Sequence, residues 1–199
     1  MYKMIRGVFW MFRDMVKANR SYRRFFEEEE VTREVLITLV DYARLTPSGA
    51  NKQALNYYLA ADKVLNGQVF ETLGWAGYLK DWDGPVVGER PSAYIIVVQD
   101  KAYKMVTAFD AGIAAQTILL GATEMGLGGC IIANIKHAQL QTALNIPDNL
   151  EILLVIALGS PKETVVVEEI EADGDIKYWR DEEQVHHVPK RQLKDIVRN

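Results

Sequence analysis

Residues 106–133 read VTAFDAGIAAQTILLGATEMGLGGCIIA and contain the clearest helix of the chain. Positions 106–125 are rich in small residues, so neighbouring elements can approach this helix closely and we expect it at the centre of the molecule. Gly126 suits the end of the helix, because glycine adopts the left-handed conformation of a helix C-terminus at little cost. The glycines and apolar residues of 127–133 then indicate a short strand.

The segments outside this helix complete an α+β pattern. Residues 93–99 and 152–158 are nearly all apolar, which is typical of strands buried on both faces. Another helix is expected after Thr32, a good N-cap residue, and it ends before Pro47, because the residue before a proline disfavours helical geometry. Helices and strands interleave without a repeat or a low-complexity linker, which predicts a single domain over residues 1–199.

The two ends of the chain have their own character. Apolar residues at three- and four-residue spacing predict an amphipathic helix within residues 1–18. We expect it to pack against a second subunit rather than a membrane, because it is short and contains Asp14. Residues 175–199 form a charged C-terminal arm, in which Pro189 is expected to end one segment. A further helix is expected to begin at Gly67.

Composition excludes several classes of protein. The 199 residues are 49% hydrophobic and 25% charged, which is ordinary for a globular protein. The net charge of -4 gives no global basic field for a nucleic-acid partner. No apolar run approaches the roughly 20 residues of a membrane-spanning helix, and no secretory signal is recognisable. We therefore expect a cytoplasmic protein without a membrane partner.

Several common catalytic centres have no counterpart in the sequence. Cys130 is the single cysteine, so neither an internal disulfide nor a multi-cysteine zinc site can form. His186 and His187 are adjacent and make a poor chelate, and we expect no metal site. Neither a GxSxG serine elbow nor a GxxxxGK[ST] phosphate loop occurs.

Three separated segments together suit a phosphorylated, planar ligand with polar edges. Arg20 and Arg23 bracket Ser21, and two guanidinium groups with a hydroxyl can hold a phosphate. The pair Lys190-Arg191 offers a second phosphate clamp. In the loop 47–53, the amides of Asn51 and Gln53 provide donors and acceptors for a pyrimidine-like edge. Each of these segments, taken alone, is more often an ordinary surface segment than part of a binding site.

The order of five motifs resembles the FMN-dependent nitroreductase family. Together they span residues 19–195 in the order that this family shows. The motifs are RSYRRF at 20–25, TPSGANKQ at 46–53, DAGIAAQ at 110–116 followed by GLG at 126–128, LGSP at 158–161, and KR at 190–191.

The resemblance implies a three-layer α+β fold with a central mixed, mainly antiparallel sheet flanked by helices, in an intertwined homodimer. Two FMN sites would lie at the dimer interface, with a backbone N–H of residues 131–134 near flavin N5 and part of the loop 47–53 supplied by the second subunit. The implied FMN-binding residues are Arg20, Ser21, Arg23, Pro47, Ser48, Asn51, Gln53, Ile131, Ile132, Ala133, Lys190 and Arg191. No catalytic side chain is implied, because the flavin carries the chemistry.

The implied activity is a ping-pong transfer of two electrons from NADH or NADPH, through FMN, to a nitroaromatic, quinone or similar acceptor. Other flavin chemistry, such as dehalogenation or flavin breakdown, and a non-catalytic flavin-binding dimer remain alternatives. They are favoured by departures from the family pattern: Asn19 in place of an arginine, Ala54 and Leu55 in place of a proline and an aromatic residue, and the apolar Ile131. The aromatics of loop 74–84 either stack on an acceptor or anchor the loop.

Overall fold

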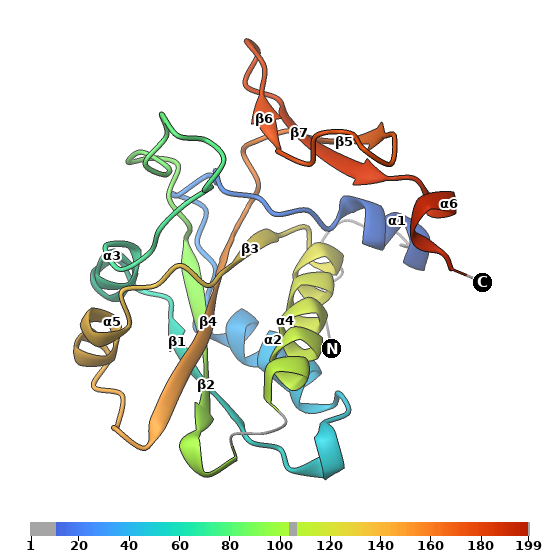
Figure 1. Cartoon of the computed structure of the whole chain (residues 1–199). Coiled ribbons are helices and arrows are strands. Elements are labelled where there is room, and N and C mark those ends of the chain that lie inside the picture. Colours follow the sequence, from blue (N-terminus) through green and yellow to red (C-terminus); the bar gives the residue numbers. More distant parts are fainter. Residues whose placement is uncertain (1–10, 104–106, 199) are drawn as a thin grey trace.

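The centre of the molecule is a four-stranded antiparallel sheet with strand order β1-β2-β4-β3 (Figure 1). The computed structural model describes residues 11–103 and 107–198. The strands of the sheet are β1 (Leu55–Ala60), β2 (Ala93–Asp100), β3 (Gly128–Ile132) and β4 (Leu150–Gly159). The two predicted buried strands are therefore confirmed, and they are the inner pair.

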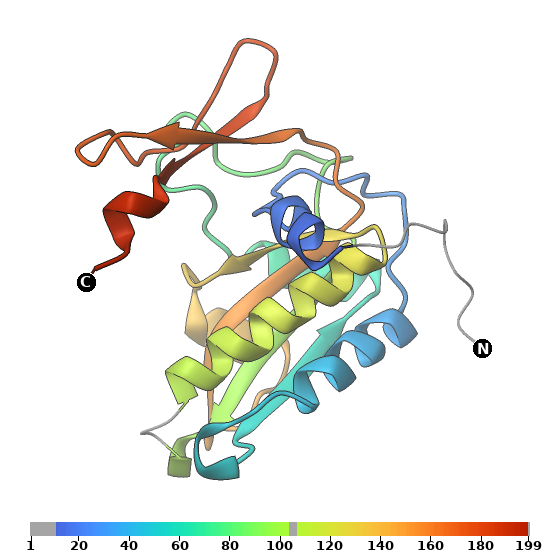
Figure 2. The ribbon, with the colours of Figure 1, turned by 90° about the vertical axis from the view of Figure 1, so that its right-hand side faces the viewer.

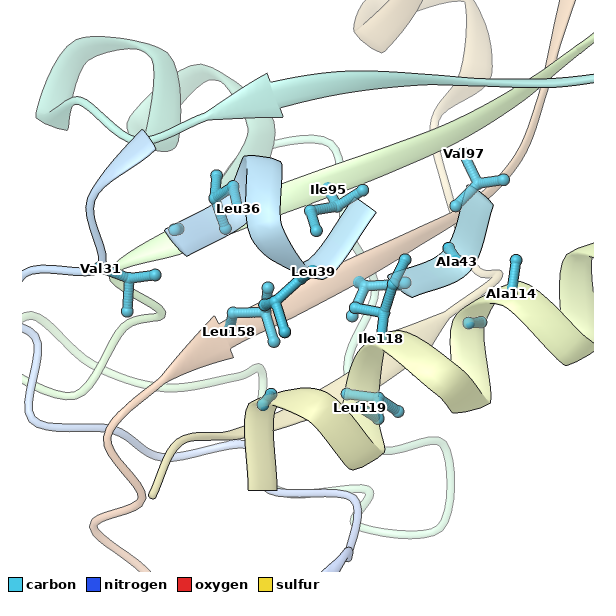
Figure 3. Packing of buried hydrophobic residues seen from close by; sticks show 14 residues of the cluster. Val31, Leu36, Leu39, Ala43, Ile95, Val97, Ala114, Ile118, Leu119 and Leu158 are labelled. Carbon is cyan, nitrogen blue, oxygen red and sulfur yellow. The ribbon is translucent and has the colours of Figure 1, made fainter. Parts of the chain in front are cut away.

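Helices cover both faces of this sheet, as Figure 1 shows. One face carries α2 (Arg33–Arg44) and α4 (Thr107–Glu124), and the other carries α3 (Lys63–Phe70) and α5 (His137–Ala143). Alternate residues of β2 serve the two cores, because successive side chains of a strand point to opposite faces. Ile95 packs with Leu36, Leu39 and Ile118 (Figure 3), whereas Ile96 belongs to the core beneath α3 and α5. The predicted three-layer arrangement is confirmed.

The small residues of α4 allow α2 to pack closely against it. A Cβ added to Gly121 would lie 2.6 Å from the ring of Tyr42, so a larger residue has no room there. Gly126 follows the helix with a φ of +77°, the left-handed conformation expected at its end. The prediction of a central helix ending at this glycine is confirmed.

The C-terminal part forms a second sheet with strand order β5-β7-β6. Its strands are β5 (Val165–Ile170), β6 (Trp179–Arg180) and β7 (His186–Arg191), and the short helix α6 (Leu193–Ile196) follows. The pair β5 and β7 is parallel, whereas β6 and β7 are antiparallel. Figure 2 shows this sheet above β3 and α1 (Phe12–Ala18), outside the three layers. The mainly antiparallel character expected of the central sheet is confirmed, and the parallel strand pair belongs to this second sheet.

Three local expectations have different outcomes. The helix expected at Gly67 begins four residues earlier, because the Asp62 carboxylate accepts a hydrogen bond from the backbone N–H of Leu65 and caps it. Pro189 does not end a segment. It lies inside β7, where β6 pairs only with the two histidines, so its missing N–H costs no bond on that edge. The N-terminal helix is seen as α1, and residues 1–10 lie outside the described residues.

Within the described ranges, no helix has the length and apolar character needed to cross a bilayer. Two short turns of 3-10 helix occur near the start of α4. Gly49–Asn51 contacts α4 in space, and Lys101–Tyr103 precedes α4 in the sequence.

Candidate functional site

The segment 20–25 lies along the outer edge of β3. Ser21 pairs with Gly129, and the backbone N–H of Tyr22 donates to the Gly129 carbonyl at 3.0 Å. Because the backbone groups of alternate strand residues point to the same edge, those of Ile131 also face this outer edge. The Ile131 side chain is 40% exposed, whereas Ile132 is buried in the core. The structure thus brings the first motif and residues 129–131 together.

A glycine makes this contact possible. A Cβ on Gly128 would lie 2.4 Å from the ring of Tyr22 and 2.7 Å from Pro161, so the chain approaches β3 only where a side chain is absent. Gly128 therefore allows the arginine segment to lie against β3.

The positive charges of Arg20 and Arg23 are not neutralised by carboxylates in the part of the chain that the structure describes. Arg20 donates to the carbonyls of Asn19 and Val16, at 2.5 and 2.9 Å. Arg23 donates to the Ser21 carbonyl at 3.2 Å, and its guanidinium lies 4.9 Å from the centre of the Tyr178 ring. Both cations are therefore available to an anionic ligand.

Arg24 in this segment and Asn19 just before it have structural partners. Arg24 binds the Glu89 carboxylate through two hydrogen bonds, of 2.6 and 2.7 Å. Asn19, which occupies the position of a family arginine, donates to the Thr123 hydroxyl at 3.1 Å and accepts from Gln116 at 3.3 Å. Asn19 thus ties the segment to α4 rather than adding a charge.

Glu163, Arg180 and His186 form a polar network beside Arg23 that the sequence did not predict. The Glu163 carboxylate accepts hydrogen bonds from the backbone N–H groups of Arg23 and Arg24, and it binds Arg180 at 2.8 Å. His186, which is fully buried, lies 3.2 Å from the Arg23 guanidinium through Nε2. Burial, with the nearby charges of Arg23 and Arg180, lowers the pKa of His186 to about 4. His186 is therefore neutral and accepts the hydrogen bond from Arg23.

The loop 47–53 has an unusual backbone that is held at both ends. Ala50, Asn51 and Gln53 have φ values of +50°, +52° and +50°, a conformation that side chains disfavour. The backbone N–H of Gly49 donates to Asp110, and that of Gln53 donates to the Ser48 hydroxyl at 3.2 Å. The strained turn exposes the amides of Asn51 and Gln53 at the surface.

Pro47, Ser48 and Gln53 also line a cavity of about 170 Å³ beside Tyr57 and Asp110. Three of the four predicted members of this loop therefore share one small concave surface, and Asn51 is exposed outside its lining.

The structure does not bring this loop to the arginine segment within one protomer. Asp110 lies in the first turn of α4 and Gly126 follows its last turn, which separates the two regions by about 24 Å at 1.5 Å per residue. Figure 2 shows the loop and the segment 20–25 near opposite ends of α4. A site that uses both needs a second copy of the chain.

Lys190 and Arg191 also lie apart from Arg23. Both side chains are exposed near the end of β7, whereas His186, the residue that contacts Arg23, begins the strand. Four residues of strand correspond to about 13 Å. The expected phosphate clamp is therefore not assembled from these two cations and Arg23 in a single protomer.

The loop 74–84 lies against the end of β3. The backbone N–H of Gly74 donates to the Asn134 carbonyl at 2.9 Å, and a Cβ on Gly74 would overlap the Asn134 side chain. Trp75 packs on Phe70, Tyr78 on Tyr178 and Trp82 on Arg180, at 5.8, 4.9 and 4.3 Å between centres. These contacts favour the interpretation that the aromatics anchor the loop.

The donor sets fit the groups of FMN. Two guanidinium groups without carboxylate partners suit a phosphate, and the outward N–H of Ile131 suits a ring acceptor. The exposed amides of Asn51 and Gln53 suit a pyrimidine edge. Among the residues that the structure describes, no three His, Cys, Asp or Glu side chains gather as a metal site requires.

Glu163, Arg180 and His186 are the residues that sequence patterns did not reveal as part of this region. Glu163 follows the LGSP motif by two residues, which is the one hint of its position in the sequence. A single carboxylate after a turn has no distinctive spacing, so this hint identifies no role.

Comparisons with known proteins agree on one family. The Nitroreductase family model matches residues 16–160. The chain is 38% identical over 156 residues to an NADPH-flavin oxidoreductase of Vibrio harveyi, an alignment that covers 74% of this chain and 65% of that protein.

Solved structures show the same fold. A nitroreductase family protein from Clostridium novyi NT superimposes with a TM-score of 0.64 at 26% identity, over 77% of this chain and 86% of that one. The NADPH:FMN oxidoreductase of Vibrio harveyi complexed with NAD+ gives a TM-score of 0.60 at 23% identity, over 76% of this chain and 69% of that one.

Proposed function

The chain belongs to the nitroreductase family, and we propose that it is an FMN-dependent NAD(P)H oxidoreductase. Its electron acceptor is a nitroaromatic, a quinone or a similar small molecule. The observation that carries this proposal is the position of Arg20 and Arg23 beside the outer edge of β3, where neither cation has a carboxylate partner among the described residues. The NADPH-flavin oxidoreductase among its relatives supports the same reaction class.

The active form that we propose is a homodimer. The loop 47–53 and the arginine segment lie near opposite ends of α4, so two copies related by a twofold axis would bring each loop to the other copy's segment. The outer face of α4 suits such a contact, because Phe109 is 80% exposed and Ile113 41% exposed. Gly112 between them leaves open space for a neighbouring side chain.

The roles of the side chains follow from their chemistry. Arg20, Ser21 and Arg23 bind the phosphate and ribityl end. Lys190 and Arg191 would add charge to this phosphate site from the C-terminal arm of the second copy, because in the same copy they lie about 13 Å along β7 from His186, the residue that contacts Arg23. Glu163 and His186 hold the backbone and guanidinium of Arg23 in place.

The ring end of the site is built from the loop and from β3. Pro47, Ser48, Asn51 and Gln53 contact the flavin across the dimer, with the two amides on its pyrimidine edge. The strand end 131–133 lies along the ring and presents the Ile131 N–H. Bound FMN supplies the two-electron transfer, so the chain needs no acid–base pair.

We propose a ping-pong order, in which the oxidised nicotinamide leaves before the acceptor enters. This order follows if one pocket over the flavin serves donor and acceptor in turn. The loop 74–84, which contacts Asn134 just beyond β3, would form one wall of that pocket. We also propose one domain over residues 1–199 and a cytoplasmic location, where the free thiol of Cys130 stays reduced.

The test is an anaerobic absorbance spectrum of the purified protein, before and after NADH and then NADPH. We expect a flavin spectrum that bleaches with one donor and returns on addition of a nitroaromatic or a quinone. Free FMN at the same concentration is the control. The proposal fails if the protein retains no flavin after reconstitution with FMN, or if the bound flavin is reduced no faster than free FMN.

A further inference from the structure

A cavity of about 400 Å³ lies between α3, the start of β2 and the segment that follows Phe25. We call it the α3 cavity, and its charged lining residues are Glu27, Glu30, Asp62, Lys63 and Arg90. In Figure 1, α3 is on the opposite side of the sheet from α4. None of the residues assigned above to flavin lines it, so it is a separate site.

The charges of the α3 cavity are not paired with one another. In residues 11–103 and 107–198, none of its three carboxylates or two cations takes part in an ion pair. Glu27 accepts a hydrogen bond from the backbone N–H of Gly88 at 2.5 Å, which fixes its position at the wall. Groups of both signs therefore line one concave surface, and no direct ion pair joins them in the described residues.

Arg90 is held in place by an aromatic ring rather than by a carboxylate. Its guanidinium carbon lies 4.1 Å from the centre of the Phe70 ring, a cation–π contact. The Nε–H of Arg90 is buried and has no hydrogen-bond partner among the described residues. A buried donor without a partner is costly, so Arg90 is suited to receive an acceptor.

Two more polar groups of the cavity lack partners in the described part of the chain. The Asn66 amide donates to the Ser92 carbonyl at 2.6 Å, which fixes its orientation and leaves the buried Oδ1 as an acceptor. Tyr94 is completely buried and its hydroxyl is unpartnered. Burial raises the pKa of Tyr94, with opposing effects of Arg90 and Glu27, so the hydroxyl is near both charges and stays protonated.

We propose that the α3 cavity binds a small zwitterion of the amino-acid class. Its carboxylate lies toward Arg90 and Lys63, and its ammonium lies toward Glu27, Glu30 and the Asn66 oxygen. A simple anion would meet three carboxylates, and a simple cation would meet two cations. A zwitterion complements both sets, and 400 Å³ leaves room for an amino-acid side chain beside Phe70. This site goes beyond the proposed redox function.

The test is a calorimetric titration of the flavin-loaded protein with the standard L-amino acids. The strongest binder is then compared with two analogues of the same side chain, one without the ammonium and one without the carboxylate. We expect saturable binding that weakens at least about tenfold in each analogue. The proposal is overturned if no amino acid binds at concentrations up to about 10 mM, which exceeds the Kd of an ordinary specific ligand. It is also overturned if either analogue binds as tightly as the amino acid itself.

Two exposed charges of the cavity give variants that fold. Glu30→Gln and Lys63→Gln are each expected to weaken binding about tenfold, because each removes one of the charges that the zwitterion meets. Glu28→Gln and Arg33→Gln are matched controls, since these residues are exposed and lie outside the lining. Flavin content and reduction by the nicotinamide donor stay unchanged in all four. Wild-type binding in both cavity variants would overturn the proposal, whatever the redox assay shows.

Discussion

The backbone N–H of Gly49 donates to both carboxylate oxygens of Asp110, at 3.0 and 3.3 Å. Asp110 is 5% exposed and lies in the first turn of α4, where the helix dipole favours a negative charge. The contact joins the longest helix of the described chain to a loop with three left-handed non-glycine residues. The carboxylate therefore acts as a positioning group for the Asn51 and Gln53 amides.

Replacing Asp110 tests this positioning role. In Asp110→Ala the loop loses its attachment to α4, and we expect the Kd for FMN to rise about tenfold or more, which corresponds to the loss of one charge-assisted hydrogen bond. Limited proteolysis within residues 47–53 should become faster at the same time. Fluorescence titration with FMN gives the affinity.

The conservative variant separates positioning from charge. Asp110→Asn keeps one oxygen acceptor for the Gly49 N–H, so most of the flavin affinity should return. Asp41→Ala is the control, because Asp41 is an exposed carboxylate paired with Arg44 on α2. Equal flavin affinity in wild type and Asp110→Ala would show that the loop holds its shape alone.

The ion pair between Arg24 and Glu89 is expected to stabilise the fold without serving the flavin. Both side chains are mostly buried, and Glu89 has its pKa lowered by the hydrogen bond from Arg24. We expect Arg24→Ala to lower the free energy of unfolding by about 1 to 2 kcal/mol, between a surface and a buried pair, with FMN affinity retained.

A double-mutant cycle with Glu89→Ala isolates the pair. Urea unfolding of the two single variants and the double variant gives the coupling free energy. Lys162, 3.3 Å from Glu89, stays in all variants, so it does not mimic the coupling. Additive effects would mean that the pair contributes no stability, and loss of FMN in Arg24→Ala would place Arg24 in the binding site.

His187 makes the stability of the second sheet depend on pH. Its Nδ1 lies 2.7 Å from Glu168 and its Nε2 lies 3.0 Å from Asp181. The hydrogen bonds to Asp181 and Glu168 raise the pKa of His187 above its usual 6.5, and the bond to His187 lowers the pKa of Asp181 below its usual 3.8. The contact therefore stabilises the fold fully between these two usual values.

The sign of the effect follows from the protonated histidine. Stabilisation by His187 is present below its unfolded pKa and is lost as pH rises through the raised folded pKa. We expect Tm to fall over this range, and His187→Gln to remove that part of the fall. His137→Gln is the control, because His137 is exposed at the start of α5. An identical pH profile in His187→Gln and wild type would contradict the assignment.

Much of the fold was predictable because its signals are local. The apolar runs of β2 and β4 are buried on both faces, and Gly126 ends α4 as its position suggests. The start of α3 was misplaced, although Asp62 is a standard capping residue. Gly67 lies inside α3, where glycine is disfavoured, so it marks the helix start less reliably than the Asp62 cap.

The supports of the candidate site were beyond a single sequence. Glu163 binds the backbone of Arg23 across 140 residues, and His186 contacts the same arginine across 163. Glu163 and His186 act on Arg23 because they are buried and close to it in space, and the spacing of residues in the sequence does not reveal such contacts. The sequence motifs identify the arginine segment and the loop 47–53 as candidate binding residues. Only the structure shows that the length of α4 separates these two regions within one protomer.

Because the arginine segment and the loop 47–53 lie apart in one protomer, we predict that the outer face of α4 forms the dimer interface. Phe109 is 80% exposed and touches neither Arg23 nor the Asn51 amide in any contact that the structure records. If the flavin site is completed by a second copy packed on this face, Phe109→Glu buries a charge at the interface and opposes dimerisation. We expect a monomer by light scattering, with the Kd for FMN raised at least about tenfold.

The control is Val64→Glu, which places the same charge on an equally exposed apolar residue of α3, 73% exposed on the opposite side of the sheet. This variant should remain a dimer that binds FMN normally, so a general effect of added charge is excluded. A Phe109→Glu monomer that binds FMN like the wild type would show that one protomer holds a complete site. A dimer that persists in Phe109→Glu and in Ile113→Glu would move the interface to another face.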